Sequence, residues 1–327
     1  MNIHKANIIA VLVTVALILL FSPALYADIL YVDQGIRPQE LDDGSTWGQA
    51  FKHLQQALDI AQAGDEIRVA NGTYTPADPN GDPNATFQIV SGVTVRGGYA
   101  GVGAEDPDAW DLGLYRTVLS GDLNNDDGEN WSQRTDNAFH VVTCAGTDAN
   151  TVLEGVAIAN GHAFEENRAY IPWLDPNAPS RTSGGQKSMG GGLYLDEASA
   201  VTLKLCRFQD NTAFMGGGAL FAQRYSTAQV HHCDFVSNYS TGGGGGINSA
   251  PKASDIILTH CNFHGNGSRS GGNAIEIWDC RLKASHCRFH NNTGTGESGR
   301  TATVENTAGD APLVNSVFPG NKNLAID

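Results

Sequence analysis

Hydrophobic and polar positions repeat with a long period in the second half of the chain. Four six-residue segments follow the pattern Cys-x-Phe-x-x-Asn, and successive phenylalanines are 27, 28 and 26 residues apart. A fifth copy at 316–321 lacks the cysteine, and a degenerate copy lies at 156–161. Clusters of glycine, each followed by a short apolar run, alternate with these segments. A repeat of this length predicts a solenoid built from stacked coils.

The positions within one repeat predict an all-β solenoid with parallel strands. A coil of roughly two dozen residues holds two or three short strands. Cysteine and phenylalanine are two residues apart, so both side chains point to the same, inward face of a strand. The asparagine falls at a turn, where we expect a left-handed conformation and hydrogen bonds to the asparagine of the next coil. The predicted ladder residues are Cys206, Cys233, Cys261, Cys287, Phe208, Phe235, Phe263, Phe289, Asn211, Asn238, Asn266 and Asn292.

An amphipathic helix is predicted at 46–63, before the repeats. Its apolar face would be formed by Trp47, Phe51, Leu54, Leu58 and Ala61, which follow one another at steps of three or four residues. Such a helix would cover the open end of the solenoid, whose first coil otherwise exposes its strand edges. Strands of the early coils are predicted at 65–74, 87–98, 116–121, 139–144 and 151–159.

The N-terminus has the layout of a secretory signal peptide. Lys5 precedes a predominantly apolar run at 8–21, and Ala27 offers a small residue for cleavage. The run is short for a membrane span, which needs about 20 residues; an uncleaved membrane anchor is the alternative. We therefore expect a secreted or cell-surface protein that has no transmembrane segment once the signal is removed. The predicted organisation is a signal peptide at 1–27, an N-terminal cap with the helix at 28–64, and the β-helix at 65–327.

Composition and charge exclude several classes of protein. Glycine accounts for 39 of 327 residues and charged residues for only 17%, so the chain is not a coiled coil or a charged helical bundle. With 41% hydrophobic residues it can bury a core, which excludes a disordered chain. The net charge of −15 makes nucleic acid a poor partner. Acidic polysaccharides are also repelled, unless a local basic patch or bound cations intervene.

The alternation of Phe-x-x-Asn with Gly-Gly and small apolar residues resembles the repeat of chlamydial polymorphic outer-membrane proteins. It is similar also to secreted parallel β-helix proteins of planctomycete-type bacteria, whose first strands resemble the segments 31–33, 43–47 and 64–67. The resemblance implies a right-handed parallel β-helix of the pectin lyase-like type. It also implies adhesion or surface roles more often than a defined reaction.

Six cysteines, at 144, 206, 233, 261, 280 and 287, raise the question of disulfides. An even number of cysteines in an exported protein suggests disulfide pairing. The four repeat cysteines, however, would be about 4.8 Å apart in parallel strands, with side chains that run side by side instead of facing one another. A buried stack of thiols is therefore the favoured interpretation, and disulfides are the alternative.

An acidic segment at 122–129 is the best candidate for a metal site. Asp122, Asn124 and Asp126 occupy positions 1, 3 and 5 of a calcium-binding loop. The glycine comes one place late, and position 12 is Gln133 in place of glutamate. Calcium is the cofactor that this segment would bind, and a solvated acidic turn is the alternative.

An insertion at about 164–188 interrupts the repeat, and insertions on the side of a solenoid often carry function. Its exposed aromatic side chains could stack on sugar rings, and its charged groups could bond to hydroxyls. A loop that packs on itself is the alternative. The candidate ligand-binding residues are Glu165, Glu166, Arg168, Tyr170 and Trp173.

The repeat positions show no catalytic constellation. Glycosidases need a pair of carboxylates beside the scissile bond, whereas the charged residues of the repeats are scattered. The leading hypothesis is a non-catalytic protein that binds an extracellular polysaccharide or a surface protein; the alternative is a polysaccharide lyase or glycoside hydrolase. The last repeat ends close to Asn321, so either the product is short or a partner covers the edge of the final coil.

Overall fold

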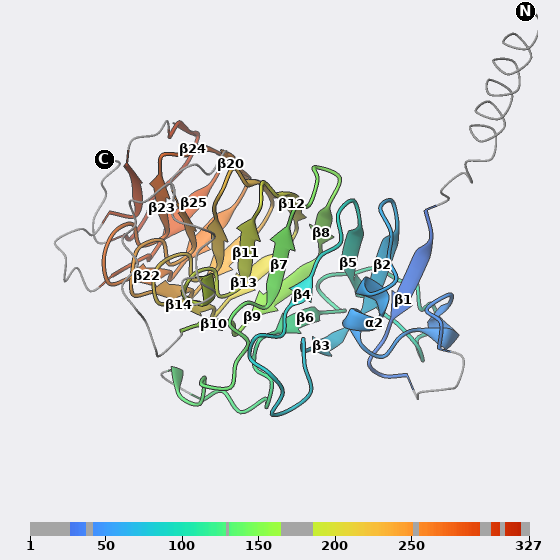
Figure 1. Ribbon diagram of the computed structural model, residues 1–327. Helices are drawn as coiled ribbons and strands as arrows, with labels where there is room; N and C mark the ends of the chain where they lie inside the picture. Colours follow the sequence, from blue (N-terminus) through green and yellow to red (C-terminus); the bar gives the residue numbers. More distant parts are fainter. Residues whose placement is uncertain are drawn as a thin grey trace, which may run out of the picture.

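The chain winds into a parallel β-helix in which successive coils stack on one another (Figure 1). The structure is a computed structural model that describes residues 27–36, 42–128, 131–164, 186–250, 255–294, 302–307 and 311–321. All pairs of strands within these ranges are parallel, which confirms the predicted all-β class. No helix in the same ranges is long and apolar enough to cross a membrane.

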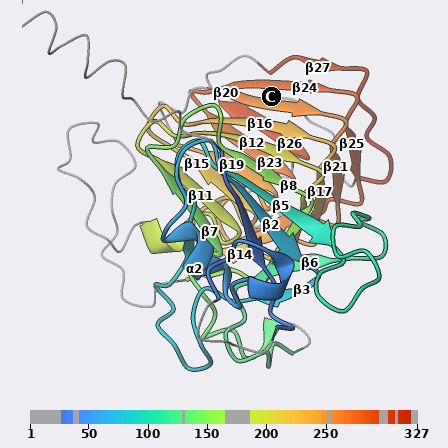
Figure 2. The same ribbon diagram turned by 90° about the vertical axis from the view of Figure 1, so that its right-hand side faces the viewer.

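Four parallel sheets form the walls of the solenoid. Sheet A holds β1 (Ile29–Val32), β2 (Glu66–Ala70), β5 (Thr94–Tyr99), β8 (Val152–Glu154), β12 (Ala200–Lys204), β16 (Thr227–His231), β20 (Asp255–Thr259), β24 (Arg281–Ser285) and β27 (Leu313–Val314). Sheet B holds β3 (Gly72–Tyr74), β6 (Thr117–Ser120), β9 (Val156–Ala159), β13 (Arg207–Gln209), β17 (Asp234–Val236), β21 (Asn262–His264) and β25 (Arg288–His290). Figure 2 shows the strands of sheet A lying one above another.

The two remaining sheets complete each coil. Sheet C holds β4 (Phe87–Gln88), β7 (Val142–Ala145), β11 (Leu193–Asp196), β15 (Leu220–Ala222), β19 (Ile247–Ser249), β23 (Ile275–Trp278) and β26 (Val304–Thr307). Sheet D is short and holds β10 (His162–Ala163), β14 (Thr212–Ala213), β18 (Tyr239–Ser240) and β22 (Gly267–Ser268). A coil therefore passes through sheets C, A and B in turn and, in the regular repeats, through sheet D before it returns to sheet C.

Phenylalanine rings stack along the interior of the solenoid. Phe208, Phe235, Phe263 and Phe289 are fully buried. The centroids of successive rings are 4.9, 4.5 and 4.8 Å apart, and the ring planes differ by 12° or less. Phe318 continues the stack, 4.7 Å from Phe289. The spacing is that of neighbouring strands, because equal positions of successive coils pair in register.

Asparagine side chains form a second ladder inside the solenoid. Oδ1 of Asn238 accepts hydrogen bonds from the backbone N–H and the Nδ2 of Asn211, at 3.1 and 3.0 Å. Nδ2 of Asn238 donates to the carbonyl of Phe208 at 3.0 Å and to Oδ1 of Asn266 at 2.9 Å. The same pattern recurs in the next two coils. Each amide thus satisfies groups in the coils on both sides.

The left-handed conformation predicted for these asparagines is wrong. Positive φ belongs to the residue before each asparagine, as at Asp210 (55°), Ser237 (54°) and Gly265 (64°). The asparagines themselves are fully buried and point inward. Because the side-chain amide bonds to both neighbouring coils inside the solenoid, the residue before it adopts the positive φ of the turn.

The helix predicted at 46–63 is wrong in length. The structure has a 3-10 turn η1 (Trp47–Gln49) and a five-residue helix α2 (Leu54–Leu58). Between them Phe51 forms a parallel bridge to Val32 of β1, which requires an extended backbone. The buried side of α2 packs into the main apolar core, where the helix contacts β1, β2 and β4 near the N-terminal end of the solenoid (Figure 1). Strand β1 lies within the segment predicted as the cap and is the first strand of sheet A.

The six cysteines are all free and buried. Sγ of Cys233 accepts a hydrogen bond from the backbone N–H of Cys206 at 3.4 Å. The thiols of Cys206 and Cys261 donate to backbone carbonyls of the preceding coil, both at 3.3 Å. Burial is the main cause that raises the pKa of the Cys233 thiol well above its usual range. A thiol in this state stays protonated and is a poor nucleophile.

We expect the four repeat cysteines to stay reduced in the folded protein, because all four are free and buried at equal positions of neighbouring coils. Titration of denatured, unreduced protein with a thiol reagent should count at least four free groups. A sample reduced beforehand serves as the control and should count all six. Detection of two or three disulfides by mass spectrometry would contradict the thiol stack.

Candidate functional site

Charged side chains form a row on the outer face of sheet A. Alternation along each strand turns the apolar residues inward and the charged ones outward. The parallel register sets Arg68 beside Arg96, Arg96 beside Glu154, and Glu154 beside Lys204. Equal positions on neighbouring strands are about 4.8 Å apart, so charges in this row interact directly.

Carboxylates bridge the two arginines of this row. Oε1 of Glu66 accepts from Nε of Arg68 at 2.8 Å, and Oε2 of Glu66 lies 3.2 Å from Nη1 of Arg96. Nε of Arg96 contacts Glu154 at 3.0 Å, and Nη1 of Arg68 contacts Asp108 at 2.8 Å. Partial burial works to lower the pKa of Arg68, but the hydrogen bonds to Glu66 and Asp108 outweigh it and the pKa is raised. The pKa of Arg96 is also raised, so both groups are permanent cations.

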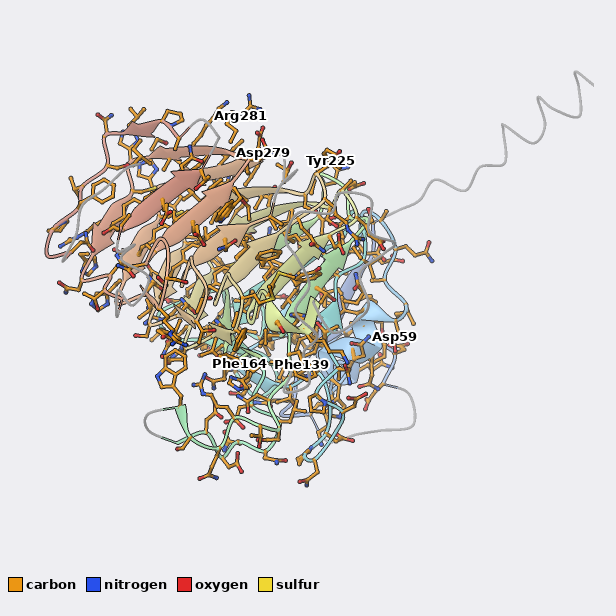
Figure 3. The ribbon with its side chains drawn as sticks, turned by 60° about the vertical axis from the view of Figure 1, so that its left-hand side comes forward. Asp59, Phe139, Phe164, Tyr225, Asp279 and Arg281 are labelled. Carbon is orange, nitrogen blue, oxygen red and sulfur yellow. The ribbon has the colours of Figure 1, made fainter. Side chains whose placement is uncertain are left out.

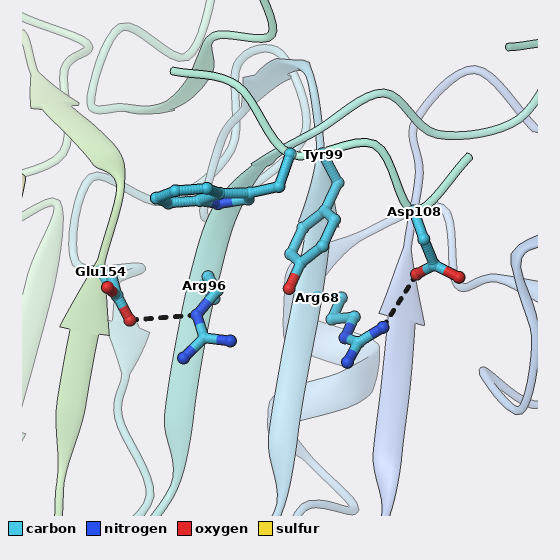
Figure 4. A pocket seen from close by; sticks show the side chains of 6 residues that line it. Arg68, Arg96, Tyr99, Asp108 and Glu154 are labelled. Carbon is cyan, nitrogen blue, oxygen red and sulfur yellow. Dashed lines mark hydrogen bonds and ion pairs between the residues drawn. The ribbon is translucent and has the colours of Figure 1, made fainter. Parts of the chain in front are cut away.

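A pocket of about 360 Å³ opens beside this network. The chain after β5 returns across the outer face, where Trp110 forms an antiparallel bridge with Tyr99. The indole Nε1 of Trp110 donates to the carbonyl of Gly97 at 2.8 Å, which fixes the ring. In Figure 4 the Arg96–Glu154 and Arg68–Asp108 pairs lie on either side of Tyr99. The lining side chains are Arg68, Arg96, Tyr99, Asp108, Trp110 and Glu154.

The walls of the pocket are held by contacts behind them. The guanidinium of Arg68 lies 5.3 Å from the ring centroid of Tyr99 and 5.9 Å from that of Tyr31. Trp47 packs on Tyr99 with ring centroids 5.7 Å apart, and its Nε1 donates to Asp108 at 3.1 Å. A ligand would therefore meet side chains that are already ordered, which lowers the entropic cost of binding.

The chemistry of the pocket suits a neutral ring that carries hydroxyl groups. Trp110 has an exposed fraction of 43% and offers an aromatic surface. The carboxylates of Asp108 and Glu154 match the two guanidinium groups of the lining, and Glu66 pairs with both guanidinium groups, so no positive charge is left unpaired for a polyanion. Convergent donors and acceptors beside an aromatic face are typical of small-molecule sites.

The glycan-binding residues predicted in the insertion, Glu165, Glu166, Arg168, Tyr170 and Trp173, lie outside the residues that the structure describes. The insertion leaves the solenoid at Phe164, directly after β10 of sheet D. The ring of Phe164 stacks on His162 with centroids 4.4 Å apart. Figure 3 shows Phe164 on the flank of the solenoid away from Arg281 and Tyr225. The insertion thus starts from a different sheet from the one that carries the pocket.

The structure brings together two of the three predicted calcium ligands. Carboxylate oxygens of Asp122, Asp126 and Asp127 all lie within 4.8 Å of one another. Oδ1 of Asn124 accepts the backbone N–H of Asn80 at 2.7 Å, and Asp127, which was not predicted, joins the two aspartates. The carboxylate of Asp122 accepts the backbone N–H groups of Asp126 and Asp127, at 3.1 and 3.2 Å. This turn brings Asp127 next to Asp122 and Asp126.

Asp127 has an unusual environment for a carboxyl group. Burial raises its pKa to about 6 and outweighs the nearby guanidinium of Arg134, which acts in the opposite direction. Nε of Arg134 lies 3.3 Å from Oδ2 of Asp127. The side chains of both residues have exposed fractions of 10% or less.

Sequence reasoning did not predict the pocket on sheet A. One signal for it exists, because Arg68 and Arg96 are one coil apart and occupy equal positions. A search for charged residues at the spacing of the later repeats could have found that pair. The contribution of Trp110 has no such signal, since it comes from an irregular segment between β5 and β6.

The fold and the pocket together define a parallel β-helix protein with a polar, aromatic-lined site on its outer face. The family described as right-handed beta helix region matches residues 144–318, more than half of the chain, and the chain belongs to this family. This match confirms the predicted right-handed parallel β-helix. No curated protein matches the sequence.

Several solved structures have a similar fold. Pectate lyase Pel9A is 13% identical with a TM-score of 0.47, over 90% of this chain and 64% of that one. A rhamnogalacturonan lyase is 15% identical with a TM-score of 0.45, over 88% and 63%. The pectin methylesterase from Aspergillus niger is 14% identical with a TM-score of 0.42, over 91% and 88%. The chain spans less than two thirds of the length of the two lyases.

Proposed function

We propose that the chain is a secreted or cell-surface β-helix protein that binds a glycan without cleaving it, and that the pocket on sheet A is a saccharide subsite. The observation that carries the proposal is the fixed indole of Trp110 beside the ordered charges of Arg96 and Glu154. The apolar face of a pyranose can pack on the indole, while its hydroxyls bond to the charged groups. The pairing of both guanidinium groups with carboxylates favours a neutral polysaccharide over a polyuronate.

The state of the ionisable groups supports binding over catalysis. A lyase needs a base that can accept a proton, and the raised pKa values of Arg68 and Arg96 work against that role. A hydrolase needs one carboxyl group as acid and another as base or nucleophile. In this pocket Glu66 and Glu154 both form ion pairs with Arg96, so neither carboxyl group is available to act independently as the acid or the base.

The proposed location rests on the N-terminal sequence. The apolar run at 8–21 and the small residue Ala27 support export through a signal peptide. The resemblance of the repeats to surface proteins supports an adhesive or structural role. An extracellular polysaccharide is then the partner that the pocket would meet.

Trp110→Ala should weaken glycan binding at least about tenfold, because truncation of a central tryptophan in a binding site commonly costs more than about 1.4 kcal/mol. An oligosaccharide array with the parent protein identifies the ligand, and calorimetry with that ligand measures the change. Trp131→Ala is the matched control, since Trp131 has a similar exposed fraction of 41% and lies in the loop between β6 and β7. It should leave the affinity unchanged.

Two outcomes would overturn the proposal. New reducing ends or unsaturated products in the same samples would show that the protein is an enzyme. Loss of binding on deletion of 165–187, together with normal binding by Trp110→Ala, would place the glycan site in the insertion and not in the pocket.

A further inference from the structure

Acidic side chains converge in the long loop between β6 and β7. One carboxylate oxygen from each of Asp122, Asp126 and Asp127 lies within 4.8 Å of the other two. Like charges at this separation repel, so the cluster needs compensation. Arg134 supplies one positive charge through its contact with Asp127 at 3.3 Å. One guanidinium group opposite three carboxylates leaves the loop with an excess of negative charge.

Two buried oxygen atoms at the cluster have no hydrogen-bond donor among the described residues. They are Oδ1 of Asp127 and Oδ1 of Asn137. Asn137 has an exposed fraction of 1%, and the side chain of Asp127 one of 10%. Nδ2 of Asn137 donates to Oδ2 of Asp127 at 3.1 Å and to the carbonyl of Asn160 at 2.7 Å, which holds the amide against the cluster. Buried acceptors are nearly always satisfied, and an ion is one of the partners that satisfy them.

We propose that Asp122, Asp126 and Asp127 bind one calcium ion. Hard divalent cations prefer carboxylate and amide oxygens, and an oxygen that accepts one backbone hydrogen bond keeps a second lone pair for a metal. Ca²⁺ accepts irregular sets of oxygen ligands, whereas Mg²⁺ demands near-ideal octahedral geometry and usually keeps several of its waters. Three carboxylates from one irregular loop therefore suit calcium better than magnesium. The unpartnered oxygen of Asp127 gives the ion a ligand that the protein alone leaves unsatisfied.

The ion would hold the loop on the flank of the solenoid. Nη1 of Arg134 already donates to the carbonyl of Asp210 in a later coil, at 2.6 Å. Asn137 bonds to the carbonyl of Asn160. A cation between Asp122 at the start of the loop and Asp127 further along would add a third attachment. A ligand that binds only the folded chain raises stability by mass action.

Calcium titrated into chelator-treated protein should bind saturably, at one ion per chain by calorimetry, and should raise the melting temperature. Asp126→Asn should weaken this binding at least about tenfold, since it removes one of the three negative charges that attract the cation and leaves a weaker amide ligand. The Asp126 side chain is exposed, so the melting temperature without calcium should not change. Asp127→Asn is a second variant, which keeps the shape of the buried side chain and should give a similar loss.

Glu105→Gln is the matched control, because it removes one exposed negative charge from the loop between β5 and β6. It should bind calcium as the parent does, and magnesium at the same concentration should leave the parent's melting temperature almost unchanged. The site is overturned if the parent shows no saturable calcium binding, or if Asp126→Asn binds as tightly as the parent. An equal loss of calcium affinity in Glu105→Gln would show that calcium only screens the negative charge of the protein and does not occupy this site. None of these measurements depends on glycan binding.

Discussion

Phe235→Ala should lower the free energy of unfolding by about 3–5 kcal/mol, as large truncations in tightly packed cores do. The ring is fully buried and lies between Phe208 and Phe263, with centroids 4.9 and 4.5 Å away. Its removal leaves a cavity between two coils whose backbones are held at the strand spacing by their hydrogen bonds, so the gap cannot close. Urea denaturation of parent and variant measures the difference.

Phe214→Ala is the matched control for this prediction. Phe214 has an exposed fraction of 42% and makes an edge contact with Phe164 at the surface. Its loss should cost about 1 kcal/mol or less, since exposed side chains contribute little. If Phe235→Ala costs no more than Phe214→Ala, the ring does not occupy the interior.

Asn238→Asp should destabilise the protein by at least about 3 kcal/mol at pH 7, because it places an unpaired charge inside the solenoid. Nδ2 of Asn238 donates to the carbonyl of Phe208 and to Oδ1 of Asn266. A carboxylate oxygen at that position would face two acceptors at about 3 Å with no proton between them. Urea denaturation at pH 7 measures the loss.

The pH dependence gives this variant its own signature. Burial raises the pKa of the new carboxyl group in the folded state above its unfolded value. As the pH falls, the folded state of the variant therefore takes up its proton before the unfolded state does. The loss of unfolding free energy relative to the parent should then shrink toward low pH. Asn150→Asp makes the same change at an exposed position and should cost within about 0.5 kcal/mol at any pH. A deficit in Asn238→Asp that stays constant from neutral to acidic pH would contradict a buried carboxyl group.

The sequence by itself determined the repeating part of the fold. Cysteine, phenylalanine and asparagine recur at the length of one coil, and each coil pairs in register with the next. A position in the repeat is therefore also a position in the cross-section, so the periodicity alone was enough to predict parallel strands and the stack of Phe208, Phe235, Phe263 and Phe289. The local pattern did not decide which residue of the turn takes the positive φ. Ser237 takes it in place of Asn238, because the side-chain amide of Asn238 points inward and bonds to Asn266.

Only the tertiary structure decided the parts that have no period. Phe51 has helical spacing but pairs with Val32 of β1, because a strand partner was available in the fold. The pocket joins side chains from three strands of sheet A to Trp110, which arrives from an irregular segment. In the acidic loop, Asn124 accepts a hydrogen bond from Asn80, and Asp127 joins Asp122 and Asp126. In each case a partner distant in sequence set the conformation, and a pattern along the chain records only the neighbours that recur at a fixed spacing.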